Sequence, residues 1–335
     1  MLVLGIETSC DETSASVVAD GKSVISSIIA SQVEAHHPYG GVVPEIASRK
    51  HIEYIVSVVN EALIPFGIQK KQLAGIAVTQ GPGLIGSLLV GLSFAKAFAY
   101  GLSIPWIGVN HLIGHIHSVF LEPECPQFPF VALLVSGGHT IIYHVTDYLT
   151  YDILGTTLDD ACGEAFDKVS KMLGCGYPGG TIIGQLAEKG NPNAIQFPRT
   201  FIDKSNFDFS FSGIKTAVSR YIQTHPNSVH DELFDISASF QEAVVDVLTY
   251  KILHAARVTG CRSIAIVGGV AANTRLRQKV TESAIKENIH VFVPSIKYCG
   301  DNAAMIAALG YHYLINGESS CFDHDVYTKK KSKSL

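Results

Sequence analysis

Residues 2–18 read LVLGIETSCDETSASVV, which predicts a buried strand, a polar turn and a second strand. The same order returns at residues 130–145, FVALLVSGGHTIIYHV, where the turn contains a glycine pair. Each hairpin is followed later in the chain by a strand that runs into a glycine turn and a helix, at residues 76–99 and 264–284. Open α/β sheets use this pattern to present backbone N–H groups at the start of a helix.

The repeat predicts an α/β fold made of two duplicated lobes with a cleft between them. A chain of 335 residues exceeds the usual single core, which also favours two domains. A proline-bearing polar stretch at residues 122–126 predicts the boundary, so that residues 1–125 form the N-terminal lobe and residues 126–328 the C-terminal lobe. The lysine-rich residues 329–335 predict a basic, disordered tail.

The composition predicts a globular cytoplasmic protein, with 47% hydrophobic and 16% charged residues. The net charge of −5 argues against binding nucleic acid by bulk electrostatics, although it allows a local basic groove. Seven cysteines without a C-x-x-C spacing predict reduced thiols. The N-terminus lacks the basic region of a signal peptide. The apolar run at residues 84–102 contains glycines and Lys96, which favours a buried helix over a membrane span.

Two histidines four residues apart, His111 and His115, could place two imidazoles on one face of a helix, in reach of one metal ion. The spacing is weak evidence alone, because the chain has 14 histidines. Asp301 precedes an apolar run, where the ordinary role of an aspartate is to cap a helix. As a third ligand it would complete a two-histidine, one-carboxylate site suited to iron or zinc.

The two hairpin turns carry the next candidates. Asp11 and Glu12 in the first turn are either solvated acids or carboxylates that orient a nucleophile or a cation. In the second turn, Gly137 and Gly138 would let backbone amides approach an anion, although a glycine pair is also common in hairpins without a ligand.

A glycine-rich loop at residues 176–180 is either an ordinary loop or a surface for a nucleotide base. Glu164 and Asp167 lie three residues apart before it, on one face of a predicted helix. Their position between two glycine-rich loops favours contacts to ribose hydroxyls.

Nine motifs in order give the chain a resemblance to a known family: GIETSCDETS (5–14), GPGL (81–84), His111-x-x-x-His115, SGGHT (136–140), GEAFDK (163–168), GYPGG (176–180), FSFSGIKT (209–216), GGVAAN (268–273) and DNAAM (301–305). It resembles the universal tRNA adenosine threonylcarbamoyltransferase family of the bacterial TsaD type, formerly labelled O-sialoglycoprotein endopeptidase. The resemblance spans residues 5–310 and implies the actin-like ATPase fold.

The resemblance implies an activity and its components. Family members transfer a threonylcarbamoyl group from threonylcarbamoyl-AMP to the exocyclic amine of the adenosine 3′ of the anticodon, in tRNAs reading ANN codons, with release of AMP. It implies one Fe²⁺ or Zn²⁺ ion on His111, His115 and Asp301. It also implies two protein partners, the paralogous actin-like subunit TsaB and the P-loop ATPase TsaE. The residues implied for the nucleotide-bearing substrate are Leu134, Val135, Ser136, Gly137, Gly138, Asp167, Gly180 and Asn273.

The donor is an activated mixed anhydride, so no protein nucleophile is needed, and positioning and electrostatics carry the reaction. Asp11 is the hypothesis for the base that takes the amine proton, with Glu12 supporting it. Two positions depart from the family pattern: Gly184 stands where many members have aspartate, and Gly300 where threonine is frequent.

Three alternatives compete with the transferase. A metallopeptidase would need glutamate after the first histidine, and Leu112 stands there. An actin-fold kinase would have no use for the two histidines and the aspartate. A non-catalytic scaffold subunit of the same complex would lack the histidine pair, which this chain retains.

Overall fold

The structure is a computed structural model that describes residues 1–200 and 206–328. The tail predicted at residues 329–335 lies outside the described residues. The chain forms two compact units. The first contains Met1–Cys125 and the described residues from Pro294 on, and the second is Pro126–Val293. Residues 294–328 therefore belong to the first unit, and not to the C-terminal lobe to which the sequence assigned them.

The return of the chain to the first unit has a packing cause. Helix α10 (Ala303–Ile315) packs on strands β1 and β4 of that unit. Gly5 on β1 makes this possible, since a Cβ there would lie 2.1 Å from the carbonyl oxygen of Ala303. Gly310 on the helix would likewise place a Cβ 2.2 Å from the Cβ of Ala77 on β4.

The first unit is built on a five-stranded sheet in the order β3-β2-β1-β4-β5. The strands are β1 (Leu2–Glu7), β2 (Glu12–Ala19), β3 (Ser23–Ser31), β4 (Leu73–Gly81) and β5 (Trp106–Asn110). The first three are antiparallel, and β1, β4 and β5 are parallel. The hairpin register pairs Glu7 with Ser14, so the polar turn predicted from the sequence closes this end of the sheet.

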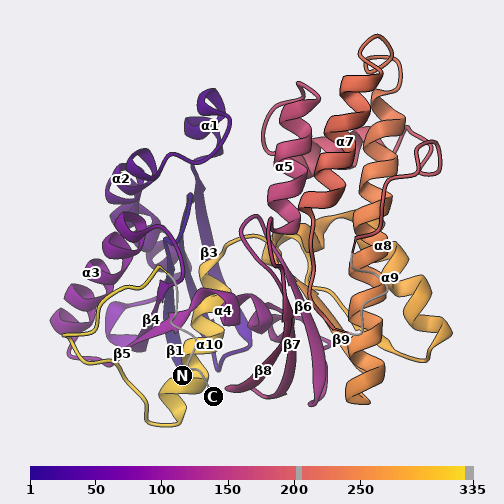
Figure 1. Ribbon diagram of the computed structural model, residues 1–335. Helices are drawn as coiled ribbons and strands as arrows, with labels where there is room; N and C mark the ends of the chain where they lie inside the picture. Colours follow the sequence, from indigo (N-terminus) through magenta and orange to yellow (C-terminus); the bar gives the residue numbers. More distant parts are fainter. Residues whose placement is uncertain (201–205, 329–335) are drawn as a thin grey trace. The chain divides into compact units, whose positions relative to one another are not determined.

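Helices cover both faces of the first sheet. Figure 1 shows α2 and α3 on one face and α4 and α10 on the other. The helical segments not yet bounded are α1 (Val33–His36), η1 (His37–Tyr39), α2 (Pro44–Leu63), η2 (Ile64–Phe66), η3 (Lys70–Gln72), α3 (Ile85–Leu102), α4 (His111–His117), η4 (Ser118–Leu121) and η6 (Ile296–Tyr298). Buried side chains of α2 and α3 pack on Leu4, Ile6 and Trp106 of the sheet. Burying each such side chain stabilises the fold by about 2 kcal/mol.

The second unit repeats the topology. Its sheet runs β10-β9-β6-β7-β8, with β6 (Phe130–Val135), β7 (Thr140–Asp147), β8 (Thr150–Thr156), β9 (Ser263–Val267) and β10 (His290–Phe292). Here too an antiparallel three-stranded meander is extended by two parallel strands. The duplication and the α/β class predicted from the sequence are confirmed.

The helices of the second unit include α8, which runs beside α7 in Figure 1 and packs on α6 and α9. Their bounds are α5 (Cys162–Met172), α6 (Gly179–Ala187), α7 (Ser212–Thr224), α8 (Leu233–Thr259), η5 (Gly269–Ala272) and α9 (Thr274–Lys286).

Among the described residues, α3 is the one helix that is long and apolar enough to cross a membrane by length and composition. In the structure α3 packs on β4 and α2. Its residues Leu88, Leu92 and Ala95 are buried there, as the sequence predicted for a helix of a folded core.

Candidate active site

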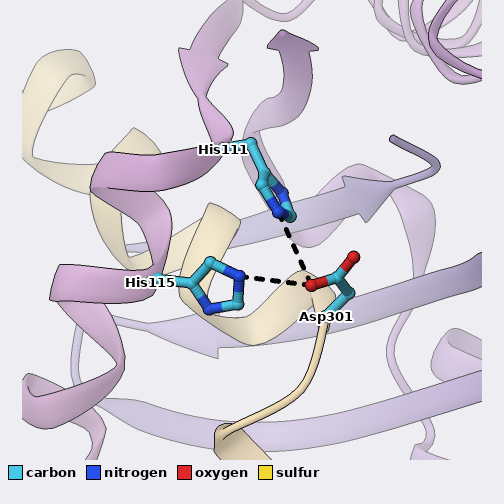
Figure 2. A group of neighbouring side chains, drawn as sticks. All are labelled: His111, His115 and Asp301. Atoms are coloured by element: carbon cyan, nitrogen blue, oxygen red, sulfur yellow. Dashed lines mark ion pairs between the residues drawn. The ribbon is translucent and has the colours of Figure 1, made fainter. Parts of the chain in front are cut away.

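Two histidines of α4 and one aspartate converge in the first unit (Figure 2). His111 and His115 lie one turn apart, and Asp301 lies in the loop before α10. The Asp301 Oδ1 atom is 3.5 Å from His111 Nε2 and 3.2 Å from His115 Nε2. The structure thus brings together the three residues proposed from the sequence as metal ligands.

Local sequence fixes where these side chains point. Asn110 caps α4 by accepting from the N–H groups of Leu112 and Ile113, so the helix begins at His111. The residue that caps α10 is Asn302, whose Oδ1 accepts from the Met305 N–H. The capping role considered for Asp301 is therefore wrong, because Asn302 performs it and leaves the Asp301 carboxylate directed at the histidines.

Glu7 is a candidate site residue that the sequence reasoning missed. Its buried carboxylate accepts from His111 Nδ1 at 2.9 Å and from Thr79 Oγ1 at 2.5 Å. Burial opposes its charge, but the bond to His111 lowers the pKa of Glu7 overall. A carboxylate behind a histidine fixes the tautomer and the ring orientation of a metal ligand, here with Nε2 towards Asp301. The available signal was a glutamate at the end of an otherwise apolar strand.

The donor set fits a divalent cation. His115 is fully buried, and neither ring nitrogen makes a hydrogen bond to any residue that the structure describes, although Nε2 faces the Asp301 carboxylate at 3.2 Å. A buried imidazole without hydrogen bonds is rare, and one that faces a carboxylate suits a shared cation. The pKa of His111 is raised to about 9, since burial is outweighed by the carboxylates of Asp301 and Glu7. Negative charge around the two rings is what a metal ion would balance.

The first hairpin turn places Asp11 and Glu12 near the same negative charge. Burial, with a further contribution from Asp301, raises the pKa of Asp11 above its usual range. Burial, followed by the charges of Asp11 and Asp301, raises the pKa of Glu12 to about 8. Ser31 donates a 2.8 Å hydrogen bond to Glu12 Oε1. These acids are therefore partly buried groups with shifted pKa values, which is typical of functional sites.

The second hairpin turn offers backbone donors. Ser136 and His139 close the turn, with Ser136 N–H donating to the His139 carbonyl at 2.9 Å. The N–H groups of Gly137 and Gly138 make no hydrogen bond within the described part of the chain. A Cβ at either glycine would meet nothing within 4 Å, so packing does not require glycine there. Free amides on an open turn suit an anion.

Helix α5 of the second unit packs against this turn at one end and carries another of the proposed nucleotide residues. Gly163 at the start of α5 packs against it, since a Cβ there would lie 2.7 Å from the Ser136 carbonyl oxygen. On the same helix, Asp167 Oδ1 accepts from the Gly179 N–H at 2.7 Å and so holds the loop that contains Gly180. The structure thus gives Asp167 a positioning contact in addition to the ribose role expected from the sequence.

Asn273 has two partners at the start of α9. Its Oδ1 accepts from the Leu276 N–H at 2.9 Å, and its Nδ2 donates to Gln241 Oε1 at 2.7 Å. A Cβ at Gly184 would be 3.7 Å from that amide nitrogen. Position 184, at which this chain departs from the family pattern, therefore lies beside a proposed nucleotide residue. Gln241 is a second residue that the sequence reasoning missed.

Glu164 behaves differently from Asp167. Its carboxylate accepts from the Ala161 N–H at the start of α5 and lies 2.8 Å from Lys168 Nζ. Lys168 also bonds Asp160. Glu164 thus caps its own helix and joins an ion-pair network, and the ribose contact weighed for it gains no support from this geometry.

Comparison with known proteins agrees with these observations. Among solved structures, the fold matches component A of (R)-2-hydroxyglutaryl-CoA dehydratase from Acidaminococcus fermentans with a TM-score of 0.56, at 15% identity over 94% of this chain and 99% of that one. It matches HypF of T. kodakarensis with a TM-score of 0.60, at 16% identity over 94% of this chain and 48% of that one. These similarities concern the fold alone and define the class: two-unit α/β proteins with the actin-like ATPase fold.

Sequence comparison gives the family within that class. The model of the family TsaD, tRNA N6-adenosine threonylcarbamoyltransferase, matches residues 23–308. A protein of that name from Desulforapulum autotrophicum is 55% identical over 331 residues, which cover 99% of each chain. Another from Clostridioides difficile is 51% identical over 321 residues, 95% of each chain. The chain belongs to the tRNA N6-adenosine threonylcarbamoyltransferase family, as the resemblance implied.

Proposed function

We propose that this protein transfers a threonylcarbamoyl group from threonylcarbamoyl-AMP to the exocyclic amine of the adenosine 3′ of the anticodon, in tRNAs reading ANN codons. AMP is the second product. The observation that carries the proposal is the convergence of His111, His115 and Asp301 in a chain of this family. A non-catalytic scaffold would have no use for two buried histidines directed at one carboxylate.

His111, His115 and Asp301 would hold one Fe²⁺ or Zn²⁺ ion, and Glu7 would orient His111 from behind. When bound, the ion supplies Lewis-acid stabilisation of negative charge on the donor. Two histidines and one carboxylate leave coordination positions for a substrate.

The second unit would bind the nucleotide end of the donor. The free N–H groups of Gly137 and Gly138, at the end of the strand that contains Leu134 and Val135, suit its phosphate. Gly180 and Asn273 would contact the nucleoside, and Asp167 would hold the Gly179–Gly180 backbone in place. Precise holding of the activated donor lowers the barrier without a covalent enzyme intermediate.

The transfer needs one base to accept the proton of the adenine amine. The adenine amine nitrogen attacks the carbamoyl carbon, a C–N bond forms, and the C–O bond to phosphate breaks as AMP leaves with the electron pair. The amine proton passes to Asp11. A raised pKa makes this carboxylate a stronger base than an exposed aspartate. Glu12, with a pKa of about 8, is mostly protonated at neutral pH and would support the site by donating a hydrogen bond.

We also propose that the protein works with other subunits. The net charge of −5 supports sharing of tRNA affinity with other subunits, for which the actin-like subunit TsaB and the P-loop ATPase TsaE are the candidates. Apolar side chains of α2 and α3 are exposed, including Ile52, Val56 and Ile85. They suit pairing with a second folded subunit. Because the proposed substrate is tRNA, we expect the protein to work in the cytoplasm.

The test is threonylcarbamoyl transfer in vitro with this protein, TsaB, TsaE, threonylcarbamoyl-AMP and unmodified tRNA. The tRNA is digested and its nucleosides are identified by mass spectrometry. We expect a threonylcarbamoyladenosine peak that His111→Ala removes. If the metal-loaded wild-type protein with all partners gives no peak, the transferase proposal fails and the scaffold becomes the better explanation.

A further inference from the structure

A fully buried histidine of α2 has no part in the function proposed above. His51 makes two short contacts: Thr13 Oγ1 lies 2.7 Å from its Nδ1, and the Cys10 carbonyl oxygen lies 2.9 Å from its Nε2. A carbonyl can only accept, so Nε2 must donate. Burial lowers the pKa of His51, so the ring is neutral and its single proton is on Nε2. Nδ1 is then the acceptor for the Thr13 hydroxyl.

The bond to Cys10 is one of three that hold consecutive carbonyls of the first hairpin turn. The Ser9 carbonyl accepts from the Leu84 N–H at 2.8 Å, and the Asp11 carbonyl accepts from the Gln32 N–H at 3.0 Å. His51 supplies the donor between them, and it is the one side chain of the three. Three separate segments of the first unit thus fix the backbone on both sides of Asp11.

The three donors, Leu84 N–H, His51 Nε2 and Gln32 N–H, form a clamp on the turn, and Gln32 also contacts His51. It is buried, and its side-chain nitrogen lies 3.4 Å from the Ala47 carbonyl oxygen and 3.5 Å from His51 Nδ1. Ala47 and His51 are one turn apart on α2, which packs on β2 and β3. The imidazole is therefore held in place by the helix, by Thr13 and by the strand end at Gln32, and it has little freedom to follow a moving turn.

We infer that His51 is a positioning residue for the transfer reaction, which directs the Asp11 carboxylate by holding the carbonyl of the preceding residue. This rests on the proposed function, because the role of Asp11 belongs to it. The Cys10 carbonyl is part-buried, and such a carbonyl that loses its donor tends to reorient towards water or another donor. A displacement of about 1 Å at a catalytic group can lower a rate by about 10²-fold. The clamp thus acts on the rate, and not on the affinity for either substrate.

Two variants of His51 separate this role from simple core packing. In His51→Gln, the amide nitrogen can take the place of Nε2 and still donate to the Cys10 carbonyl. In His51→Asn, the shorter amide reaches only the place of Nδ1. We expect His51→Gln to keep kcat within about threefold of wild type, and His51→Asn to lower kcat by about tenfold or more, with the KM for threonylcarbamoyl-AMP unchanged.

A readout independent of activity accompanies the kinetics. Hydrogen exchange of the complete protein should be faster at the Ser9 and Gln32 amides in His51→Asn than in wild type or His51→Gln. The Ser9 N–H belongs to the turn and bonds the Glu7 carboxylate, and the Gln32 N–H bonds the Asp11 carbonyl. Metal content should be equal in all three. Thr13→Val is the matched comparison, since it removes one partner of Nδ1 and leaves the Nε2 bond; it should lower kcat less than His51→Asn does.

Several results would overturn the inference. One is a wild-type kcat in His51→Asn, and another is an equal loss of kcat and of protection in the asparagine and glutamine variants. If His51→Asn does not fold, ¹⁵N NMR of the wild-type protein tests the inference by identifying the tautomer of His51. A proton on Nδ1 would rule out the hydrogen bond from Nε2 to the Cys10 carbonyl. If the wild-type protein transfers nothing, the proposed function fails, while hydrogen exchange still reports whether His51 orders the turn.

Discussion

The hairpin turn after the first strand of each unit has the same place in the topology, but one turn carries acids and the other carries free backbone amides. Each contains four residues, 8–11 after β1 and 136–139 after β6. In the first, Thr8 and Ser9 are buried, and every backbone carbonyl from Ser9 to Asp11 is held by a donor from another segment. In the second, Gly137 and Gly138 are exposed and their N–H groups have no partner within residues 1–200 and 206–328.

The difference shows how one scaffold supports two kinds of site. Burial raises the pKa values of the acids where this turn meets β2, Asp11 and Glu12, which suits the proton transfer proposed for Asp11. An exposed glycine turn changes no pKa but leaves amides for an anion. Variants in the two units should therefore have different effects: a lower rate from the first turn, a loss of metal binding from the proposed ligands behind it, and a lower donor affinity from the second turn.

The largest effect should come from removing one of the proposed metal ligands of the first unit. His111→Ala should abolish metal binding and lower transfer by at least about 10²-fold, because the stabilisation of charge is lost. Metal content is measured by elemental analysis of the purified protein, and transfer by nucleoside mass spectrometry. His117→Asn on the same helix is the control, since its ring packs on Phe120 and His312. Equal metal loss in both variants would contradict the assignment.

The second prediction tests the buried side of that site. Glu7→Gln removes the charge behind His111 and keeps the shape of the side chain, so the affinity for Zn²⁺ should fall by about 10–100-fold. Competition titration against a zinc chelator measures it. Thr79→Val, which removes one donor to Glu7 but leaves its charge, should have a smaller effect. An unchanged affinity in Glu7→Gln would show that Glu7 only fills space.

Much of this contrast could be predicted from the sequence, because it depends on local patterns. The strands and glycine turns follow from runs of apolar residues, and the family motifs indicate His111 and His115. The orientation of Asp301 could not be predicted from its neighbours in sequence. Its position suggested a helix cap, but the adjacent Asn302 caps α10 instead. The hydrogen bond from His51 to the Cys10 carbonyl could not be predicted for another reason. His51 lies 41 residues from Cys10 on a different element, and only packing brings the two residues together.

The same reason explains the domain assignment. Residues 294–328 follow the second sheet directly in sequence, and nothing in their composition indicates a return to the first unit. The cause is steric: Gly5 and Gly310 leave room for α10 on β1 and β4. Such contacts join distant segments and have no local signature.

The third prediction concerns the exposed turn. Gly138→Val should raise the KM for threonylcarbamoyl-AMP by about tenfold, because a branched side chain would shield the free amides of the turn from a phosphate. The fold and the metal content should not change, since a Cβ at position 138 meets nothing within 4 Å. Gly101→Val is the control, because a Cβ there also meets nothing. A normal KM would argue against donor binding at this turn.

The smallest effect should be a pH-dependent change in stability at Glu12. Its pKa is about 8 in the folded protein against an ordinary 4.5, so below pH 4.5 the folded and unfolded chains are both protonated and nothing is lost. Between pH 4.5 and 8 the unfolded chain releases the proton while the folded chain retains it, so the stability falls as the pH rises. Above about pH 8 the loss is complete.

Glu12→Gln lacks this proton and should escape the loss. In metal-free protein the variant and the wild type should melt together near pH 4.5, and the variant should melt a few degrees higher at pH 8.5. Thermal unfolding across this range measures the difference, with Glu34→Gln on an exposed position as the control. Saturating zinc should reduce the gap, since a cation beside Asp301 stabilises the ionised Glu12. A gap that does not depend on pH would mean that the buried turn does not raise the pKa of its acids.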